Sequence, residues 1–135
     1  MNSIIPEIGR PFARPDAKDK VTGKEKFAID FYGENLLWAG VKRAGIAHGR
    51  IRKIDLDAAA KLSGVIKILT GADVPGPNRQ GIVHKDQPVL VADKVRYSGD
   101  AVALVIAQDK ETLKKALHLI QVDYDLLPAV FDVDD

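Results

Sequence analysis

The 135-residue sequence predicts an α+β domain preceded by an extended arm. Two patterns predict this class: the apolar run Ala101 to Ala107, typical of a buried strand, and a helical apolar period directly after it. Composition is the third observation. Hydrophobic residues make up 46% and charged residues 29% of the chain, as in a folded domain and unlike a disordered one. A chain of this length can bury a core without disulfides or metals.

The 101–107 strand begins a strand-helix-strand unit. Asp109 is a typical helix cap, and the helix repeats apolar residues at i, i+3, i+4 and i+7, namely Leu113, Ala116, Leu117 and Ile120. His118 lies just off this stripe. In the final strand, one face is predicted to be buried and the other wet, because Val122, Tyr124 and Leu126 alternate with Asp123 and Asp125.

An earlier unit has the same order of elements. Arg50 to Leu56 predicts a strand, and the Asp57 carboxylate is expected to cap a short helix that ends at Ser63-Gly64. Residues 65–69 then return as a strand. The domain is therefore predicted to contain two strand-helix-strand units.

The arm is assigned to residues 1–25, and the domain to residues 26–135. The arm is rich in Pro, Gly and Lys, with turns expected at Gly9-Arg10-Pro11 and Thr22-Gly23. Two further strands are predicted, at 26–30 and 35–43, separated by a turn at Gly33-Glu34-Asn35. Both faces of the 35–43 strand are apolar, so we expect both to be covered.

A long loop separates the two units. Three glycines and two prolines within residues 71–81 are incompatible with regular structure, and a loop this long inside a domain is often functional. Gln80-Gly81-Ile82-Val83 lacks the Lys-Ser/Thr of a phosphate-binding loop. We expect a segment ordered by a partner, and a solvent loop without a partner is the alternative. The expected contact residues are Pro75, Gly76, Asn78 and Gly81.

Conventional active-site patterns are missing from the sequence. The chain has no cysteine, which excludes a disulfide, a thiolate metal site, a chain-held iron-sulfur cluster and a cysteine nucleophile. No serine lies in a Gly-x-Ser-x-Gly elbow. The carboxylate pairs Asp55/Asp57 and Asp123/Asp125 fit a strand end and a wet strand edge. His48, His84 and His118 are isolated from one another, so no catalytic, cofactor-binding or metal-ligating residue is predicted.

The charges nearly cancel, with 20 Lys and Arg against 19 Asp and Glu. The long-range field of a nucleic-acid or anionic-membrane binder is therefore missing, and neither partner is expected. Two basic stripes, at 18–26 and 42–53, carry no interleaved aromatic residues and indicate a solvated face, with an acidic partner protein as the alternative. Neither a secretory signal nor a membrane-spanning stretch is evident, which predicts a cytoplasmic protein.

A series of motifs covers nearly the whole chain. In order, they include Gly9-Arg10-Pro11, Arg14-Pro15-Asp16-Ala17, Lys20-Val21-Thr22-Gly23, Leu37-Trp38-Ala39, His48-Gly49-Arg50-Ile51, Leu69-Thr70-Gly71-Ala72-Asp73-Val74-Pro75-Gly76, Asp86-Gln87-Pro88-Val89-Leu90, Asp93-Lys94-Val95-Arg96-Tyr97-Ser98-Gly99-Asp100 and Val122-Asp123-Tyr124-Asp125-Leu126-Leu127-Pro128-Ala129-Val130. The series resembles the N-terminal α/β hammerhead domain of the large, molybdenum-binding subunit of the aldehyde oxidase and xanthine dehydrogenase family. One departure is the turn before His48, where Gly45 stands and the family's proline is missing. That departure leaves the substrate open.

The resemblance implies a larger enzyme around this domain. The complete subunit would bind molybdopterin and hydroxylate a carbon next to nitrogen or oxygen, with electrons passing to 2Fe-2S clusters and FAD in partner modules. Its partners would be the remainder of the molybdenum-binding subunit and an iron-sulfur subunit or domain. The family's pterin-binding stretches and glutamate base lie C-terminal to this domain, so none is assigned to these residues.

The chain is then expected to be structural and noncatalytic by itself, either a piece of a longer subunit or a short open reading frame. The alternative is a stand-alone docking or binding module that keeps the fold without the chemistry.

Overall fold

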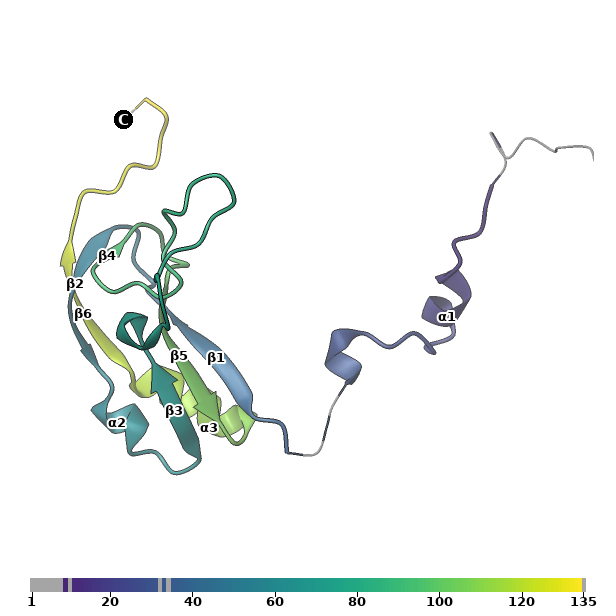
Figure 1. Ribbon diagram of the computed structural model, residues 1–135, viewed down its shortest axis with the longest axis horizontal. Helices are drawn as coiled ribbons and strands as arrows, with labels where there is room; N and C mark the ends of the chain where they lie inside the picture. Colours follow the sequence, from purple (N-terminus) through teal and green to yellow (C-terminus); the bar gives the residue numbers. More distant parts are fainter. Residues whose placement is uncertain (1–8, 10, 32, 34, 135) are drawn as a thin grey trace, which may run out of the picture. The chain divides into compact units, whose positions relative to one another are not determined.

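The computed structural model describes residues 9, 11–31, 33 and 35–134. The chain divides into two compact units, Met1–Asn35 and Leu36–Asp135, and each is described by itself (Figure 1). The predicted division between arm and domain at residues 25 and 26 stays a prediction.

The larger unit is built on two antiparallel sheets of three strands each (Figure 1). The first sheet has the order β1 (Trp38–Arg43), β5 (Ala101–Ala107) and β3 (Val65–Leu69). The second has the order β4 (Lys94–Val95), β2 (Gly49–Asp55) and β6 (Gln121–Leu126). Two helices accompany the sheets, α2 (Asp57–Ala60) and α3 (Lys110–Leu119).

Both predicted strand-helix-strand units are present, and each passes from one sheet to the other. The unit β2-α2-β3 starts in the second sheet and ends in the first, whereas β5-α3-β6 runs in the opposite sense. Strand β2 pairs with β6, β3 pairs with β5, and α2 contacts α3. Each strand of one unit is therefore hydrogen-bonded to a strand of the other, and the predicted α+β class is confirmed.

Helix α3 forms as the sequence predicts. The Asp109 carboxylate accepts hydrogen bonds from the Thr112 N–H at 2.8 Å and the Thr112 hydroxyl at 2.7 Å, which satisfies an otherwise unpaired donor of the first turn. The predicted stripe faces the core, with Leu113, Ala116 and Ile120 buried and Leu117 half-buried. His118 is exposed, as its place off the stripe predicts.

The helix packs on the first sheet through the inward residues of β5, Ala103, Val105 and Ala107, all fully buried. Strand β1 approaches α3 closely at Gly40. A Cβ atom there would lie 3.0 Å from a methyl carbon of Leu113, so a glycine permits this packing distance.

A second cluster lies at the other end of the sheets and includes Ala44, Val91, Val95 and Val102. Ile54 and Val122 pack against both clusters, so the two form a continuous core. Asp100 is the buried charged residue of this region, and its carboxylate accepts the Arg96 N–H at 2.6 Å. The two-residue strand β4, which the sequence analysis missed, lies beside this turn.

The N-terminal unit differs from its prediction. The 26–30 strand is wrong: residues 28–30 form a 3-10 helix (η1, Ala28–Asp30), and the Asp30 carboxylate accepts the Phe27 N–H at 2.9 Å. That local bond satisfies backbone that a strand would have to pair with a neighbour. A short helix, α1 (Ala17–Val21), also forms within the predicted arm. The turn at Thr22-Gly23 is confirmed, whereas Arg10 of the 9–11 turn and Glu34 of the 33–35 turn lie outside the described residues.

The larger unit differs at its element ends. Strand β1 starts at Trp38, and Ala39 is exposed, so the prediction that both of its faces are covered is wrong. The Asp57 cap is also wrong: the preceding carboxylate, Asp55, accepts the Asp57 N–H at 3.2 Å. Leu126 is 70% exposed, so the buried face of the last strand ends at Tyr124.

Candidate docking surface

The long loop between β3 and β4 starts with a tight polar turn. Residues 71–73 form a 3-10 helix, η2 (Gly71–Asp73), closed by Thr70, whose N–H and hydroxyl donate to the Asp73 carboxylate at 2.8 and 2.9 Å. These two hydrogen bonds lower the pKa of the Asp73 carboxyl, because they stabilise its charged form. In Figure 1 the chain beyond this turn is the teal loop that extends away from the strands.

Asn78 ties the two ends of this loop together. Its amide nitrogen donates to the Leu90 carbonyl at 2.6 Å, and its amide oxygen accepts the Val89 and Leu90 N–H groups at 3.1 and 3.0 Å. Gly71 lies against the same amide, since a Cβ there would be 3.0 Å from the Asn78 nitrogen. The side chain therefore satisfies both backbone groups of the buried Leu90.

Beyond Asn78 the chain forms a small hairpin, called here the 80–87 hairpin. Gln80 and Gln87 exchange two backbone hydrogen bonds, at 2.7 and 3.2 Å. Gly81 follows with φ +151°, and a Cβ there would lie 1.7 Å from the His84 carbonyl oxygen. A side chain at this position is incompatible with the turn, so Gly81 is required for its geometry.

The tip of the 80–87 hairpin is apolar and fully in solvent. Ile82 is 103% exposed and Val83 84% exposed. Charged residues surround the pair in sequence, with Arg79 before it and Lys85 and Asp86 after it, all exposed. Ile82 and Val83 therefore form a small exposed apolar pair on a protruding turn.

The structure gives the four predicted contact residues different surroundings. Pro75 and Gly76 are exposed, and Gly76 adopts φ +90°. Asn78 is half-buried with its amide bonded inside the loop, and Gly81 is exposed at the start of the turn. Their role as contacts stays a prediction. Ile82 and Val83 were not among the predicted contact residues, although an apolar pair between a glycine and charged residues was the signal that could have identified them.

Metal-binding or acid-base chemistry finds no support in the described part of the chain. No three His, Cys, Asp or Glu residues come together there in a group that could hold a metal ion. Asp55 pairs with Lys53 at 3.0 Å, and the pKa of its carboxyl is lowered by that ammonium and by the Asp57 N–H. Asp125 pairs with Arg52 at 3.1 Å. Asp55 is half-buried and Asp125 exposed, and both serve local ion pairs, so the arrangement offers no catalytic dyad.

The three histidines also lie apart. The His118 ring bonds the Lys114 carbonyl of its own helix at 2.8 Å, the His48 ring contacts the Pro128 carbonyl, and His84 belongs to the 80–87 hairpin. A groove of about 440 Å³ lies beside His48, between Tyr97 and Phe131. Its lining residues include one histidine and no carboxylate, so no acidic side chain is present there to orient His48 as a general base.

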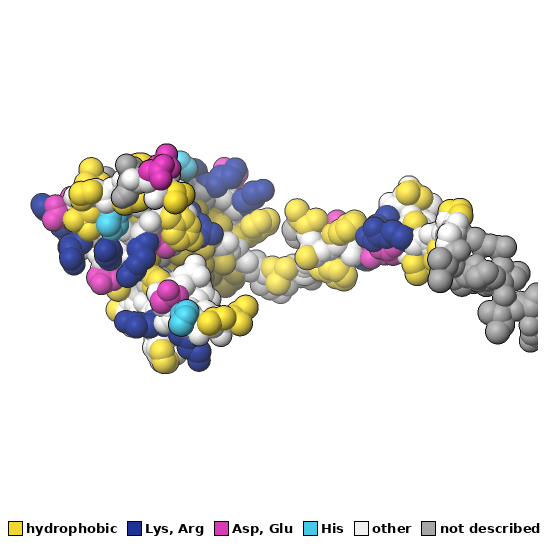
Figure 2. Space-filling view, turned by 90° about the horizontal axis from the view of Figure 1, so that it is seen from above, with side chains coloured by type: hydrophobic (Ala, Val, Ile, Leu, Met, Phe, Trp, Pro, Cys, Tyr) yellow, Lys and Arg dark blue, Asp and Glu magenta, His cyan; other side chains and the backbone are white. Residues whose placement is uncertain are grey.

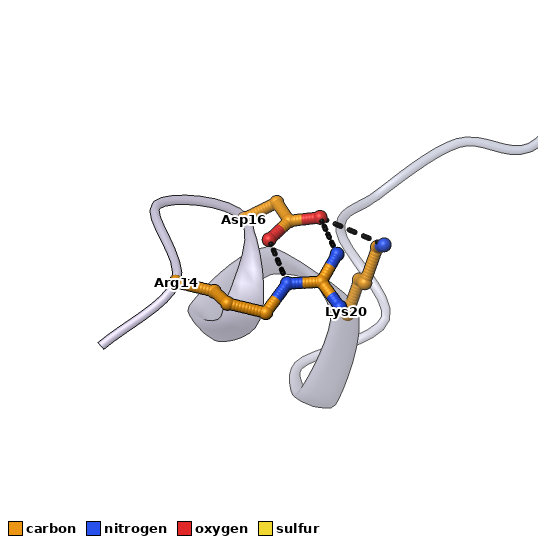
Figure 3. Close-up of polar contacts among 3 residues, drawn as sticks. All are labelled: Arg14, Asp16 and Lys20. Atoms are coloured by element: carbon orange, nitrogen blue, oxygen red, sulfur yellow. Dashed lines mark hydrogen bonds and ion pairs between the residues drawn. The ribbon is translucent and has the colours of Figure 1, made fainter. Parts of the chain in front are cut away.

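The N-terminal unit carries an ion cluster around the half-buried Asp16 (Figure 3). The Arg14 guanidinium donates two hydrogen bonds to the Asp16 carboxylate, at 2.9 and 2.7 Å, and the Lys20 ammonium lies 2.7 Å from the same carboxylate. Arg14 first and Lys20 second lower the pKa of the Asp16 carboxyl. Because all three residues belong to the segment around the five-residue helix α1, the cluster holds a local turn.

Surface charge agrees with the sequence composition. On the face seen in Figure 2, Lys and Arg side chains of the larger unit are interspersed with acidic and apolar ones. Such a face lacks the continuous basic patch of a nucleic-acid binder. Within the described ranges, no helix has the length and apolar character needed to span a membrane.

Sequence comparison decides the family. The profile of the aldehyde oxidase and xanthine dehydrogenase family, a/b hammerhead domain, matches residues 22–128. The chain belongs to this family. The resemblance seen in the motifs and the predicted hammerhead fold are both confirmed.

Curated relatives are much longer than this hammerhead domain. It is 40% identical over 127 residues to the nicotinate dehydrogenase large molybdopterin subunit of Eubacterium barkeri, covering 94% of this chain and 30% of that protein. It is 46% identical over 111 residues to a probable xanthine dehydrogenase subunit of Bacillus subtilis, covering 82% and 15%. The chain therefore spans less than a third of these relatives.

Solved structures contain the same hammerhead fold. The reconstituted CO dehydrogenase from Oligotropha carboxidovorans matches with a TM-score of 0.83 and 31% identity, over 92% of this chain and 16% of that one. The aldehyde oxidoreductase from Desulfovibrio desulfuricans matches with a TM-score of 0.78 and 35% identity, over 85% and 14%. In each, the hammerhead domain is a small part of a long chain.

Proposed function

We propose that this chain serves as the hammerhead domain of the large subunit of a molybdenum-containing dehydrogenase or hydroxylase. The observation that carries the proposal is the match over residues 22–128 to a domain of such enzymes, together with relatives named as molybdopterin and xanthine dehydrogenase subunits. The role of the domain is structural and noncatalytic, and the complete assembly oxidises a substrate that the sequence of this chain leaves open.

The whole chain has no cysteine to hold an iron-sulfur cluster, and the described residues include no group of three His, Cys, Asp or Glu that could hold a metal ion. We place molybdopterin in the remainder of the large subunit, because a relative that shares this domain is named as a large molybdopterin subunit and is much longer than the domain. We place 2Fe-2S clusters and FAD in partner modules. The partners of the domain are that remainder and the iron-sulfur subunit or domain. The cytoplasmic location stays a prediction.

A chimeric protein tests this function. Residues 22–128 replace the matching segment of the Bacillus subtilis relative, which is 46% identical over 111 aligned residues. The chimera should retain molybdenum within about twofold of the parent protein, whereas a parent with the segment deleted should lose it. A chimera with no more molybdenum than the deletion contradicts the proposal and favours a stand-alone docking module.

The loop contributes to the proposal through Pro75, Gly76, Asn78 and Gly81. If this part of the loop contacts a partner, amides 74–82 should exchange hydrogen more slowly in the chimera than in the isolated chain. Unchanged exchange would leave these four residues as a solvent loop without a partner.

A further inference from the structure

The hydrogen bonds that form the 80–87 hairpin do not depend on its apolar tip, Ile82 and Val83. The backbone bonds between Gln80 and Gln87 close the hairpin, and Asn78 anchors it to Leu90. Neither set of bonds involves the side chains of Ile82 and Val83, which are 103% and 84% exposed. These side chains add nothing to the folding of the hairpin and present apolar area that only a partner could remove from water.

The base also fixes the direction of the tip. Gly81 packs so closely on the His84 carbonyl that no larger residue fits, and the Asn78 amide makes three bonds of 2.6 to 3.1 Å. A tip held by its own backbone loses little conformational entropy on binding. The hairpin is therefore pre-organised for insertion.

We propose that Ile82 and Val83 insert together into an apolar recess on the remainder of the molybdenum-binding subunit, with Gly81 and Asn78 as positioning residues. This inference rests on the proposed function and names the surface through which the domain is held.

The small size of the tip favours a partner within the same polypeptide, the remainder of the molybdenum-binding subunit. A stable interface between separate chains takes about 20–30 residues from each side, and two side chains fall far short of that. A contact this small is effective when the partner is tethered, because the linkage raises its effective concentration. A second copy of the chain is not tethered in this way.

The comparisons favour the same occupant. Relatives that share this domain are named as the large molybdopterin subunit, the molybdenum-binding subunit and the large chain of their enzymes, and the domain covers 30%, 17% and 16% of them. In each of these relatives the domain is continuous with a much longer remainder of the same polypeptide, which is the partner we propose for the tip.

The test compares the isolated 135-residue chain with the chimera. In the isolated chain, the double variant Ile82→Asp, Val83→Asp should unfold at the same urea concentration as the wild type, because both side chains are already in solvent. In the chimera, amides 80–87 should exchange at least about tenfold more slowly than in the isolated chain. The double variant should abolish that protection.

Two further variants sharpen the result. Lys85→Gln makes the charge of the hairpin one unit more negative, as each of the two aspartates in the double variant does. It leaves Ile82 and Val83 intact, so protection of amides 80–87 should persist. Gly81→Ala keeps both apolar side chains and disturbs their positions, so protection should fall.

The outcomes separate the two proposals. A chimera that retains molybdenum but shows unprotected 80–87 amides, or equal protection in the double variant, overturns the insertion and leaves the proposed function standing. Loss of molybdenum in the wild-type chimera contradicts the proposed function itself. Binding of the isolated chain to phosphatidylglycerol vesicles, lost in the double variant, would assign the tip to a lipid surface and overturn the inference.

Discussion

The core around α3 and the 80–87 hairpin are ordered by different means. Around α3, buried side chains set the structure: Leu113, Ala116 and Ile120 lie against the fully buried β5 residues. In the hairpin, backbone and amide hydrogen bonds set it, and the largest side chains point into water. Apolar residues therefore have different roles in the two regions. Around α3 they stabilise the fold, and in the hairpin they remain exposed for contact with a partner.

The largest expected effect comes from the core. Leu113→Ala removes a buried side chain that packs on Gly40 and should lower the free energy of unfolding by about 3 kcal/mol. His118→Ala, on the exposed side of the same helix, should cost less than about 1 kcal/mol. Urea titration of both variants makes the measurement, and equal losses would mean that the stripe of α3 does not carry the packing.

The hairpin should respond to the loss of a polar group. Asn78→Ala leaves the N–H and carbonyl of Leu90 without partners and should cost about 2 kcal/mol. Gln80→Ala is the control, because the bonds of Gln80 are made by its backbone. Urea titration together with exchange at the Leu90 amide tests this; unchanged exchange at Leu90 would argue against the anchoring role of Asn78.

Acid should weaken the caps before it affects the apolar core. Hydrogen bonds from Thr112 hold the pKa of the Asp109 carboxyl below its ordinary value, and Asp73 is held low by Thr70 in the same way. A lowered pKa in the folded state contributes stability above the ordinary carboxyl pKa near 3.8, and that contribution is lost as pH falls through the lowered value. Unfolding free energy should therefore decline below about pH 4.

The variant Asp109→Asn serves as the matched control for this pH dependence. Its amide keeps an oxygen acceptor for the cap but does not titrate in this range, so its stability should fall less steeply on acidification. Urea titrations at several pH values between neutral and acidic compare the two chains. Parallel curves would place the acid sensitivity elsewhere.

The smallest expected effect is that of metal removal. The core rests on apolar packing and the hairpin on hydrogen bonds, and no group of three ligands occurs among the described residues. The purified chain should hold no stoichiometric molybdenum, iron or zinc and should show no dehydrogenase activity on purines or aldehydes. A chelator should leave its thermal unfolding unchanged. Near-stoichiometric metal by elemental analysis would contradict this.

The two regions also differ in how much their sequence reveals. The ends of β5 and β3 and the Asp109 cap were predictable because the apolar run, the cap residue and the helical period agree with one another. Two aspartates, Asp55 and Asp57, precede or begin the four-residue helix α2 and could bond its first N–H groups. In the structure the Asp55 carboxylate accepts the Asp57 N–H. Sequence alone does not separate two such neighbours.

The tip of the hairpin was not predictable as a surface. Whether Ile82 and Val83 face water depends on the Gln80–Gln87 pairing and on the anchor at Asn78, both of which follow from tertiary contacts. Strand β4 was missed for a related reason, since two residues carry no period. In contrast, the family was recognisable from the order of the motifs, which does not depend on these contacts.

The exchange of strands between the two units has a consequence for folding during synthesis. Strand β2 pairs along most of its length with β6, residues 121–126, and β1 pairs with β5, residues 101–107. In both sheets, a strand therefore pairs with one that is synthesised more than fifty residues later. Contacts so distant in sequence make folding slow, because loop-closure entropy is lost before they form. A growing chain on the ribosome therefore carries β1 unpaired until β5 emerges, and β2 without most of its pairing until β6 emerges. Until then, the apolar residues of these two strands, among them Trp38, Val41, Ile51 and Ile54, have no complete sheet to pack in and are available to a chaperone.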